Sequence, residues 1–392
     1  MPTSDDRAGT NRPQRRWATS RRRRPLVVVL GVLLLTAVPV ATAVVVPAPA
    51  VEAAPCWTLP DPPPSCPDPP PPPTTQPPPP PVPGDDDGDR IVDSYEDHLL
   101  RKFAPRVWLQ SNETSRPVRV GWLLPRSTLR FGHPRCSDDG ILPFGQVTNA
   151  NITEQSHRSK HDAIHIPPWD ACAHFGDPHP SDGYRGDIKE SFFLQFHDGD
   201  HPGSTNPRDW VIYGHVYRAS SNRYVVQYWQ LYAYDDSFAT INHEGDWEYS
   251  AVVVDSDETP QQVVFFRHGH SRVVDPSDVE WVATNHHVTY SAKGSHAQYR
   301  GRESDGGCNA DSLPDDAQGL ADRCNQGTAW DTWSPAHGGI INVGEKARPL
   351  NNANWLRYSG LWGEVGLMAD LVSYTSGPRG PAYQSSAWNW QP

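Results

Sequence analysis

The chain has 392 residues and a formal net charge of −12, but residues 1–50 carry eight arginines against two aspartates. The remainder therefore carries about −18, which disfavours nucleic acid as a partner because phosphate contacts need Lys and Arg. Divalent cations are compatible with such an acidic chain. The 15 Trp and 14 Tyr residues, together with many Gly and Pro, are typical of mainly β structure.

Residues 1–54 are typical of an export segment. Arginines at 15, 16 and 21–24 precede an almost wholly apolar stretch, residues 26–46, and small-residue patterns that suit cleavage follow it. The apolar stretch is long enough to span a bilayer, so an uncleaved transmembrane signal anchor is the alternative to a cleaved signal peptide. In both cases we expect the rest of the chain to be extracellular or at the cell surface, with membrane contact only through this segment.

Cysteines outside the cell tend to form disulfides. Sequence alone leaves the connectivity of the six cysteines open, and we favour local pairs because short loops close most readily. The favoured pairs are Cys56–Cys66, Cys136–Cys172 and Cys308–Cys324.

Residues 55–84 form a proline-rich linker, with 17 prolines between residues 55 and 83. Such a segment is disordered in the sense that it has no packed core, and it adopts extended polyproline II structure. We expect a stalk that holds the folded part away from a membrane or wall. A proline-rich ligand for a partner domain is the alternative.

The acidic stretch 85–96 has the spacing of a calcium loop. Acidic residues stand at positions 1, 3, 5, 9 and 12 of its twelve residues, and calcium takes six to eight oxygen ligands from such flexible loops. The stretch resembles thrombospondin type 3 and EF-hand-like loops, although Arg90 stands where position 6 usually has glycine. A solvated acidic linker is the alternative. The expected ligands are Asp85, Asp87, Asp89, the backbone carbonyl of Ile91, Asp93 and Glu96.

Residues 97–392 are expected to form a single antiparallel β-sandwich domain with long loops and few short helices. A short helix is predicted over residues 97–103, ended by Pro105, and a strand over 106–109. Residues 111–205 are predicted to be irregular loops with a few strands. Further strands are predicted over 209–218, 223–234, 250–255, 261–268 and 286–292. The first two form a hairpin, and the second has two apolar faces, which indicates a central strand covered on both sides.

The stretch 242–249 contains one imidazole and three carboxylates. His243 and Asp246 converge only if a turn or bulge precedes the strand. Asp246 and Glu248 share one face of a strand, because side chains alternate with period two, and Trp247 and Tyr249 then face a core on the other side. This pattern predicts a polar site mounted on a sheet.

Several motifs together resemble the vacuolar protein sorting-associated protein 62 family over roughly residues 95–390. They lie at residues 103–109, 227–234, 243–248, 292–297, 362–364 and 377–382. This resemblance implies a fold more than a function, because the family name records a trafficking association. We find no glycine-rich phosphate loop and no Gly-x-Ser-x-Gly motif.

A weaker resemblance is to the necrosis- and ethylene-inducing protein family, whose His-x-x-Asp-Trp-Glu core matches residues 243–248. In that family these residues, with an acid at the end of the preceding strand, hold a divalent metal on a β-sandwich. The resemblance implies the ligands Asp235, His243, Asp246 and Glu248. Gly245 replaces the second His of that core and Glu244 is an extra acid. The match does not extend further, so cytolytic activity is not carried over.

Because carboxylates dominate this set, Mg²⁺, Ca²⁺ or Mn²⁺ would suit it better than Zn²⁺. His268 and His296 are candidates to complete the site, and His296 is the candidate catalytic base. The alternative is structural, with His243 and Glu248 bonded to loop backbones. We expect a protein that binds Ca²⁺ or Mg²⁺ and recognises an extracellular glycan, lipid head group or wall polymer. A metal-dependent hydrolase of a phosphoester or glycan, and a structural surface module, remain open, so enzymatic activity is undecided.

Overall fold

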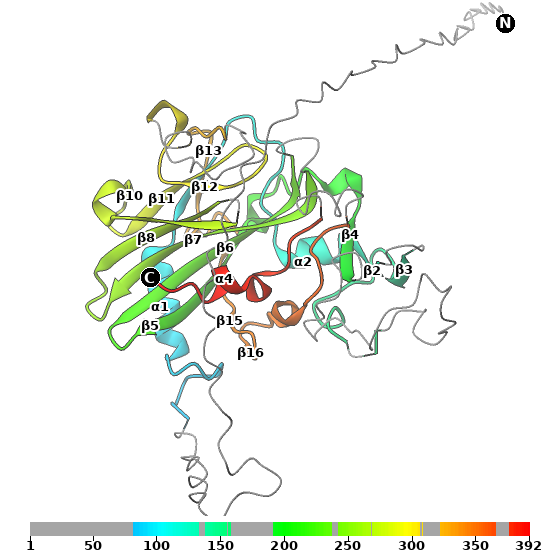
Figure 1. Ribbon diagram of the computed structural model, residues 1–392, viewed down its shortest axis with the longest axis horizontal. Helices are drawn as coiled ribbons and strands as arrows, with labels where there is room; N and C mark the ends of the chain where they lie inside the picture. Colours follow the sequence, from blue (N-terminus) through cyan, green and yellow to red (C-terminus); the bar gives the residue numbers. More distant parts are fainter. Residues whose placement is uncertain are drawn as a thin grey trace, which may run out of the picture. The chain divides into compact units, whose positions relative to one another are not determined.

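The computed structural model describes residues 81–132, 138–154, 156–157, 191–236, 242–267, 269–305, 308, 322–365 and 376–392. The expected signal or anchor and most of the proline-rich linker lie outside the described residues. So do Cys56, Cys66, Cys136 and Cys172. Residues 78–392 group into one compact unit, and its described part is mainly β structure with few short helices, as predicted (Figure 1).

The described strands form four sheets. The six-stranded central sheet has the order β14 (Gly339–Asn342), β5 (Val211–Ser220), β6 (Arg223–Asp235), β7 (His243–Asp255), β8 (Pro260–Arg267) and β9 (His270–Val274). A second sheet has the order β10 (Trp281–Val282), β11 (His286–Ser291), β1 (Arg106–Leu109) and β13 (Thr328–Asp331), with β12 (Gln298–Tyr299) also paired to β11. A third contains β3 (Asp139–Leu142), β2 (Ser127–Phe131) and β4 (Phe192–Phe196), and β15 (Gly344–Glu345) pairs with β16 (Arg348–Pro349).

The described helices are short. The α-helices are α1 (Asp93–Phe103), α2 (Val120–Leu123) and α4 (Ser385–Trp388). The 3-10 turns are η2 (Leu124–Arg126), η3 (Asp198–Asp200), η4 (Pro207–Asp209), η5 (Pro276–Asp278), η6 (Glu303–Asp305), η7 (Asn354–Arg357) and η9 (Pro381–Tyr383). In the part of the chain that the structure describes, none of the helices has the length and apolar character needed to cross a bilayer.

The predicted central strand is observed as β6, between β5 and β7. Its side chains alternate between two cores: Trp229 and Leu231 face one, and Tyr228 and Tyr232 face the other. All four side chains are fully buried. The predicted hairpin of β5 and β6, and the prediction that β6 is covered on both faces, are therefore confirmed.

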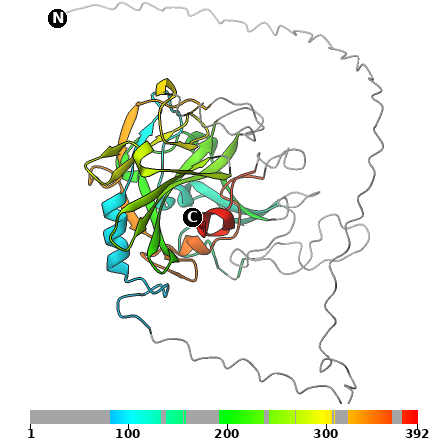
Figure 2. The ribbon, with the colours of Figure 1, turned by 60° about the vertical axis from the view of Figure 1, so that its left-hand side comes forward.

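Different layers cover the two faces of the central sheet. On one face, α1 and the β1–β13 pair contribute Leu100 and Trp330 to the core that holds Tyr228. On the other face, the third sheet and the C-terminal segment contribute Leu194 and Trp362. Figure 2 shows α1 running along one side of the sheets. The central sheet is thus the rigid middle layer from which the candidate site projects.

The sheets are mixed, which corrects the expectation of a purely antiparallel sandwich. Strands β5 to β9 are antiparallel in sequence order, but β14 runs parallel to β5 and β1 runs parallel to β11. Both parallel pairs join segments far apart in the chain. Local periodicity contains no signal for such pairs, since a parallel connection needs a long crossover.

Gly245 supplies the irregularity that the sequence predicts near the start of β7. β7 begins at His243 and pairs with β6 in continuous register from the Asp235–His243 pair. Within it Gly245 has φ +64°, and a Cβ at this position would lie 1.6 Å from the Trp362 carbonyl oxygen. Only glycine satisfies both conditions, because its hydrogen side chain permits positive φ and close backbone approach.

The disulfide Cys308–Cys324 confirms one of the predicted local pairs. Both residues are buried against Tyr290 and Tyr299, beside the second sheet. The other two predicted pairs fall on residues that the structure does not describe.

Candidate functional site

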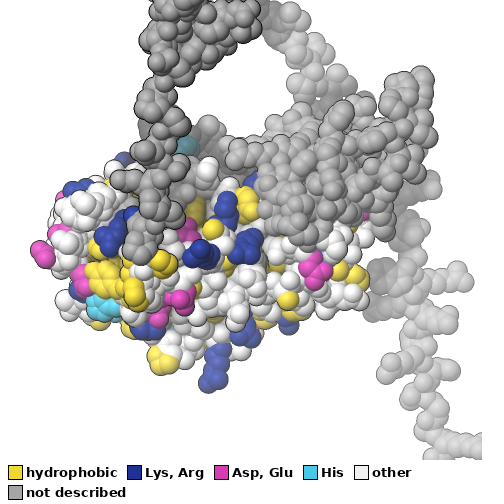
Figure 3. Space-filling model, turned by 90° about the horizontal axis from the view of Figure 1, so that it is seen from below, with side chains coloured by type: hydrophobic (Ala, Val, Ile, Leu, Met, Phe, Trp, Pro, Cys, Tyr) yellow, Lys and Arg dark blue, Asp and Glu magenta, His cyan; other side chains and the backbone are white. Residues whose placement is uncertain are grey.

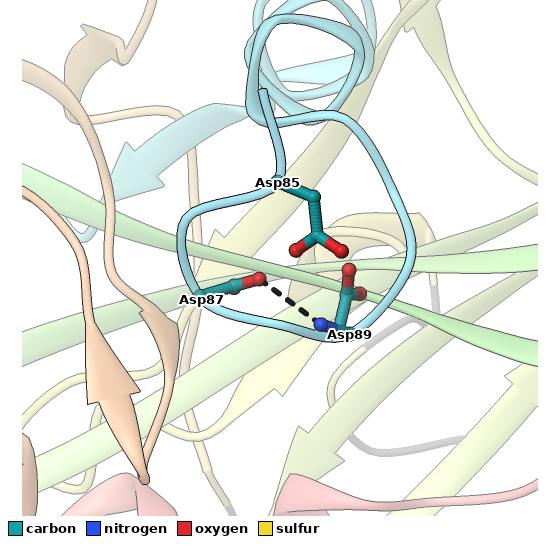
Figure 4. A group of neighbouring side chains, drawn as sticks. All are labelled: Asp85, Asp87 and Asp89. Atoms are coloured by element: carbon teal, nitrogen blue, oxygen red, sulfur yellow. Dashed lines mark hydrogen bonds between the residues drawn. The ribbon is translucent and has the colours of Figure 1, made fainter. Parts of the chain in front are cut away.

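The loop 85–96 folds around its own carboxylates. Oxygen atoms of Asp85, Asp87 and Asp89 all lie within 4.8 Å of one another, and Figure 4 shows the three side chains inside the ring of the loop. Backbone amides hold them there: the amide of Gly88 donates to Asp85 Oδ1 at 2.7 Å, and that of Ile91 donates to Asp89 Oδ1 at 2.6 Å. These local bonds fix the carboxylates before any ion binds.

The ends of the loop meet, and its backbone turns where a calcium loop requires it. The amide of Asp93 donates to the Gly84 carbonyl at 2.8 Å, so the chain leaves the loop beside the point where it enters. Gly88 has φ +88°, and Arg90, at the position usually held by glycine, has φ +74°. Arg90 therefore adopts the left-handed conformation itself, and its backbone amide donates a hydrogen bond to Asp85 Oδ2 at 3.0 Å, which stabilises this conformation.

Glu96, the last expected ligand of the loop, is fully buried in the first turn of α1. Asn342 donates to its Oε2 at 2.9 Å, while its Oε1 is buried without a hydrogen-bond partner. Asp89 Oδ2 is in the same condition. A buried carboxylate oxygen without a partner is costly, so both oxygens mark places where a cation would be stabilising.

The electrostatics of the loop point in the same direction. Burial, reinforced by the charge of Asp89, raises the pKa of Asp87 to about 7, and burial raises the pKa of Asp89 to about 6. Burial raises the pKa of Glu96 to about 9, although Asn342 donates to it. Asp87 and Asp89 lie close together, and no cation in the described part of the chain fully compensates the burial that raises their pKa values. A hard divalent ion would supply that positive charge.

A second buried cluster surrounds His296, which follows β11. Its Nδ1 lies 2.8 Å from Asp246 Oδ2, and its Nε2 lies 3.6 Å from Glu113 Oε1. The ring is fully buried and stacks on Tyr232 of β6, with ring centroids 3.7 Å apart. Glu113 is a member of this cluster that the sequence analysis missed, since it lies in a loop far from the motif.

The surroundings of Glu113 favour the ionised form of its carboxylate. Its carboxylate accepts from the backbone amides of Thr114 and Ser115 at 2.8 Å and of Gly294 at 2.9 Å. Burial would raise its pKa, but His296 and these amides lower it to about 2. Burial would likewise lower the pKa of His296, but Glu113 and Asp246 raise it to about 10. At neutral pH His296 is therefore an imidazolium without a free lone pair, which does not favour it as a general base.

The four expected ligands on the central sheet lie along neighbouring strands. Asp235 and His243 pair across β6 and β7, with Asp235 Oδ2 3.5 Å from His243 Nε2. Asp246 bonds His296. Glu248 is buried, its Oε2 has no hydrogen-bond partner, and burial reinforced by Asp246 raises its pKa well above the ordinary range.

Ligand atoms on the sheet are less tightly gathered than those in the loop. Within the described ranges, only Asp85, Asp87 and Asp89 form a group of three or more with all ligand atoms within 4.8 Å. His268 lies outside the described residues. The four side chains thus lie on the adjacent strands β6 and β7 without forming such a group. Among them, Glu248 has a buried carboxylate oxygen, Oε2, without a hydrogen-bond partner.

Glu244, the extra acid of the motif, has a structural position. Its Oε2 accepts from the amides of Phe196 and Glu364 at 2.9 and 3.1 Å, and its Oε1 lies 3.4 Å from His201 Nε2. It therefore fastens β7 to β4 and to the C-terminal segment.

A pocket of about 400 Å³ opens beside β2, β4 and η3. Phe144 at its rim is 55% exposed, and its ring centroid lies 6.1 Å from that of His197. Polar side chains share the lining with two phenyl rings and the His197 imidazole. The lining residues are Thr128, Phe144, Gln195, Phe196, His197 and Asp198.

The described part of the chain is thus a mainly β protein with several sheets, and acidic side chains gather both in the loop 85–96 and on the central sheet. Residues 234–365 match the family model described as Vacuolar protein sorting-associated protein 62, which confirms that resemblance over this range. No curated protein matches the chain.

Solved structures that are similar to the chain include proteins of the necrosis- and ethylene-inducing type. "NLPPya in complex with mannosamine" is 12% identical with a TM-score of 0.29, over 67% of this chain and 78% of that chain. Necrosis and Ethylene inducing Protein 2, from the causal agent of cocoa's Witches Broom disease, is 12% identical with a TM-score of 0.27, over 71% and 83%. Scores this low transfer no function to the chain.

Proposed function

We propose that this chain is an extracellular protein that binds Ca²⁺ in the loop 85–96 and uses the ion to fix the loop and α1 on the central sheet. The observation that carries this proposal is the convergence of Asp85, Asp87 and Asp89 within 4.8 Å, in the loop that leads to the buried, half-partnered carboxylate of Glu96. All of the donors are oxygens on a loop, which favours calcium over zinc. Magnesium would demand a stricter octahedron.

The extracellular part of the proposal is supported by the export segment predicted in residues 1–54. The Cys308–Cys324 disulfide suits an oxidising compartment. Calcium outside cells is abundant enough to saturate such loops, whose extracellular versions bind with dissociation constants of about 10⁻⁴–10⁻³ M.

A second cation, Mg²⁺ or Ca²⁺, is proposed at Asp235, His243, Asp246 and Glu248. Support comes from Glu248 Oε2, which is buried without a partner near two other carboxylates. The single imidazolium of His296 is already shared between Asp246 and Glu113. A divalent ion would supply the missing charge and the missing partner.

Cation content tests both sites. Wild-type protein equilibrated with Ca²⁺ should retain about two ions per chain, and the Asp87→Asn and Asp246→Asn variants about one each. The control Asp257→Asn changes an exposed acid and should match the wild type. At a Ca²⁺ concentration 100 times the dissociation constant, the ion should add about 2.7 kcal/mol of stability. Wild-type protein with no stoichiometric ion, and with equal melting temperatures in Ca²⁺ and in chelator, would refute the proposal.

For the ligand that the protein recognises, we propose a glycan that binds at the Phe144 pocket. An exposed aromatic ring beside Gln195, Asp198 and Thr128 offers a stacking surface and hydrogen-bond partners for hydroxyl groups. The face shown in Figure 3 carries basic and acidic side chains interspersed, so it is not the basic patch that nucleic acid needs.

A lipid head group is the rival ligand. The hydrolase and the structural module stay as alternatives, and the charged state of His296 disfavours the first.

Glycan-array binding of the Ca²⁺-loaded chain tests this ligand. Phe144→Ala should reduce binding to any glycan retained by about two- to tenfold, because one stacked ring contributes about 0.5–1.5 kcal/mol. Val273→Ala, which truncates another large apolar side chain that is exposed in the described part of the chain, should leave binding unchanged. Equal retention by wild type and Phe144→Ala would remove the pocket from consideration.

A further inference from the structure

We infer that residues 384–390, here called the C-terminal strap, are held on the central sheet by a positively charged His215 and loosen when this imidazole loses its charge. His215 lies in β5 and is 1% exposed. Its ring stacks on the indole of Trp388 in α4, with ring centroids 3.7 Å apart and an angle of 10° between the planes. Neither the ion nor the glycan proposed above takes part in this contact.

Two hydrogen bonds to the strap backbone accompany the stacked rings. Gln227 Nε2 donates to the Ala387 carbonyl at 2.7 Å, and the Tyr217 hydroxyl donates to the Trp390 carbonyl. Burial raises the pKa of Tyr217, so its hydroxyl remains a donor wherever histidine titrates. In this set of contacts, the His215 ring is therefore the group whose charge can change near neutral pH.

The hydrogen bonds of Gln227 require a proton on His215 Nδ1. Trp229 Nε1 donates to Gln227 Oε1 at 3.0 Å, whereas Gln227 Nε2 donates to the Ala387 carbonyl. The opposite orientation of the amide would place two N–H groups against each other at one end and two oxygens at the other. His215 Nδ1 lies 3.2 Å from the same Oε1, and because a carbonyl oxygen only accepts, Nδ1 carries a proton.

The second nitrogen of the ring faces a carboxylate. His215 Nε2 lies 3.1 Å from Oε1 of Glu345 in β15. Burial would raise the pKa of Glu345, but the hydrogen bond and the charge of His215 lower it below its ordinary value. Because an ionised carboxylate only accepts, Nε2 carries the second proton. With both nitrogens protonated, His215 is an imidazolium.

A cation stacked on an indole is attracted by its π electrons, most strongly where water is excluded. Trp388 is 3% exposed, so the contact is dry. When Nε2 loses its proton, this attraction is lost and the Nε2 lone pair faces the Glu345 carboxylate. A histidine stabilised in its charged form supports the fold at low pH, and that support is lost as the pH rises.

The groups around His215 favour its charged form. From β5, the Tyr217 ring centroid lies 5.0 Å from that of His215. From β15, Glu345 is the facing charge; Lys346 lies beside it, and Asp87 accepts from its backbone amide at 3.0 Å. The contacting residue of β6 is an amide, and α4 contains no titratable side chain.

Hydrogen exchange of the full chain at pH 5 and pH 9 tests this role, with protection factors that correct for the intrinsic effect of pH. The amides of Trp388 and Trp390 donate within the strap and report its opening. Relative to the amides of β6, their protection should fall about tenfold from pH 5 to pH 9. Nitrogen-15 spectra of the His215 ring should show two N–H groups at pH 5 and one at pH 9.

Three variants separate the ring contact from general effects of pH. His215→Gln should remove the response, with exchange of the strap amides at pH 5 about ten times faster than in the wild type. Trp388→Leu keeps an apolar side chain on the strap and should also remove the response. His286→Gln changes a histidine that stacks on Trp333 beside the second sheet and should keep it.

Equal relative protection of the wild-type strap at pH 5 and pH 9 would overturn the inference, and so would a His215 ring with one N–H at pH 5. Both results come from the wild type, so they decide even where a variant does not fold. The response should be the same in Ca²⁺ and in chelator. A response in only one of them would belong to the proposed ion and would also overturn the inference, whereas failure of the strap contact leaves the proposed function untouched.

Discussion

Gly245 is the residue on which the geometry of β7 depends most closely. Its φ of +64° and the 1.6 Å gap between an added Cβ and the Trp362 carbonyl oxygen are two separate demands. Gly269 offers a matched comparison, because it has φ +80° and no atom within 4 Å of an added Cβ. Alanine there tests the backbone conformation alone.

We expect Gly269→Ala to lower the free energy of unfolding by about 1–2 kcal/mol, the cost of a left-handed backbone with a Cβ. Gly245→Ala should cost about 1–3 kcal/mol more, because the Trp362 backbone must move. Urea denaturation of both variants measures the difference. Equal losses would show that the C-terminal segment yields without cost.

The residue scale also shows what the sequence predicts and what it does not. Trp247 and Tyr249 lie in the core, and Asp246 lies on the opposite face with His296, as period-two alternation requires. Glu113 was not predicted, because no local pattern relates a loop glutamate to a histidine so distant in the chain. Arg90 adopts positive φ against its residue type, which a spacing argument alone does not reveal.

At the scale of elements, Glu244 joins three pieces of chain that meet at one end of the central sheet. Two backbone amides, of Phe196 in β4 and of Glu364, share its Oε2. Both donors would be left without this acceptor if the carboxylate were removed. The side chain therefore holds the third sheet and the C-terminal segment on β7.

Glu244→Ala should lower stability by about 2–4 kcal/mol, since each buried unpartnered amide costs about 1–3 kcal/mol. Glu244→Gln keeps one acceptor oxygen and should cost less than half as much. Hydrogen exchange should show faster exchange of the Phe196 and Glu364 amides in the alanine variant. Protection equal to that of wild type at both amides would contradict this role.

Elements with strong local patterns were predictable. The β5–β6 hairpin follows from two apolar runs around a polar turn, and α1 ends at Phe103 before Pro105, although it begins four residues before the predicted start. Strands β2, β3 and β4 fall in the stretch predicted only as loops with a few strands, because β2 finds its partner β4 across a long intervening segment. The parallel β1–β11 and β5–β14 pairs have no local signature.

At the scale of the whole molecule, His287 links stability to acid. It is fully buried on β11, with Nε2 2.9 Å from Ser250 Oγ, and burial lowers its pKa to about 3. In the unfolded chain histidine titrates near pH 6.5, at about its ordinary value. Because folding lowers the pKa, His287 supports stability above pH 6.5, and that support is lost as the pH falls towards 3.

The unfolding free energy of the wild type should therefore fall by about 1.4 kcal/mol per pH unit below pH 6.5 on account of this group. In His287→Gln the dependence of the unfolding free energy on pH should be weaker by the contribution of this one titrating group, and the variant should be less stable than the wild type at pH 7. His270→Gln, on the exposed edge strand β9, should leave the slope unchanged. Parallel curves for wild type and His287→Gln between pH 4.5 and 7 would count against the assignment.

The bond between Gly84 and Asp93 has a mechanical consequence. The backbone amide of Asp93, the first residue of α1, donates a hydrogen bond to the Gly84 carbonyl. A pulling force applied to the chain before residue 84 would therefore be transmitted through this hydrogen bond directly to α1, without passing through the loop. The part of the loop that contains Asp85, Asp87 and Asp89, where we propose that an ion binds, lies beside this direct path. Load would be borne by the packing of Leu99, Leu100 and Phe103 under the central sheet, and an ion that joins loop and sheet would act as a second, parallel fastening.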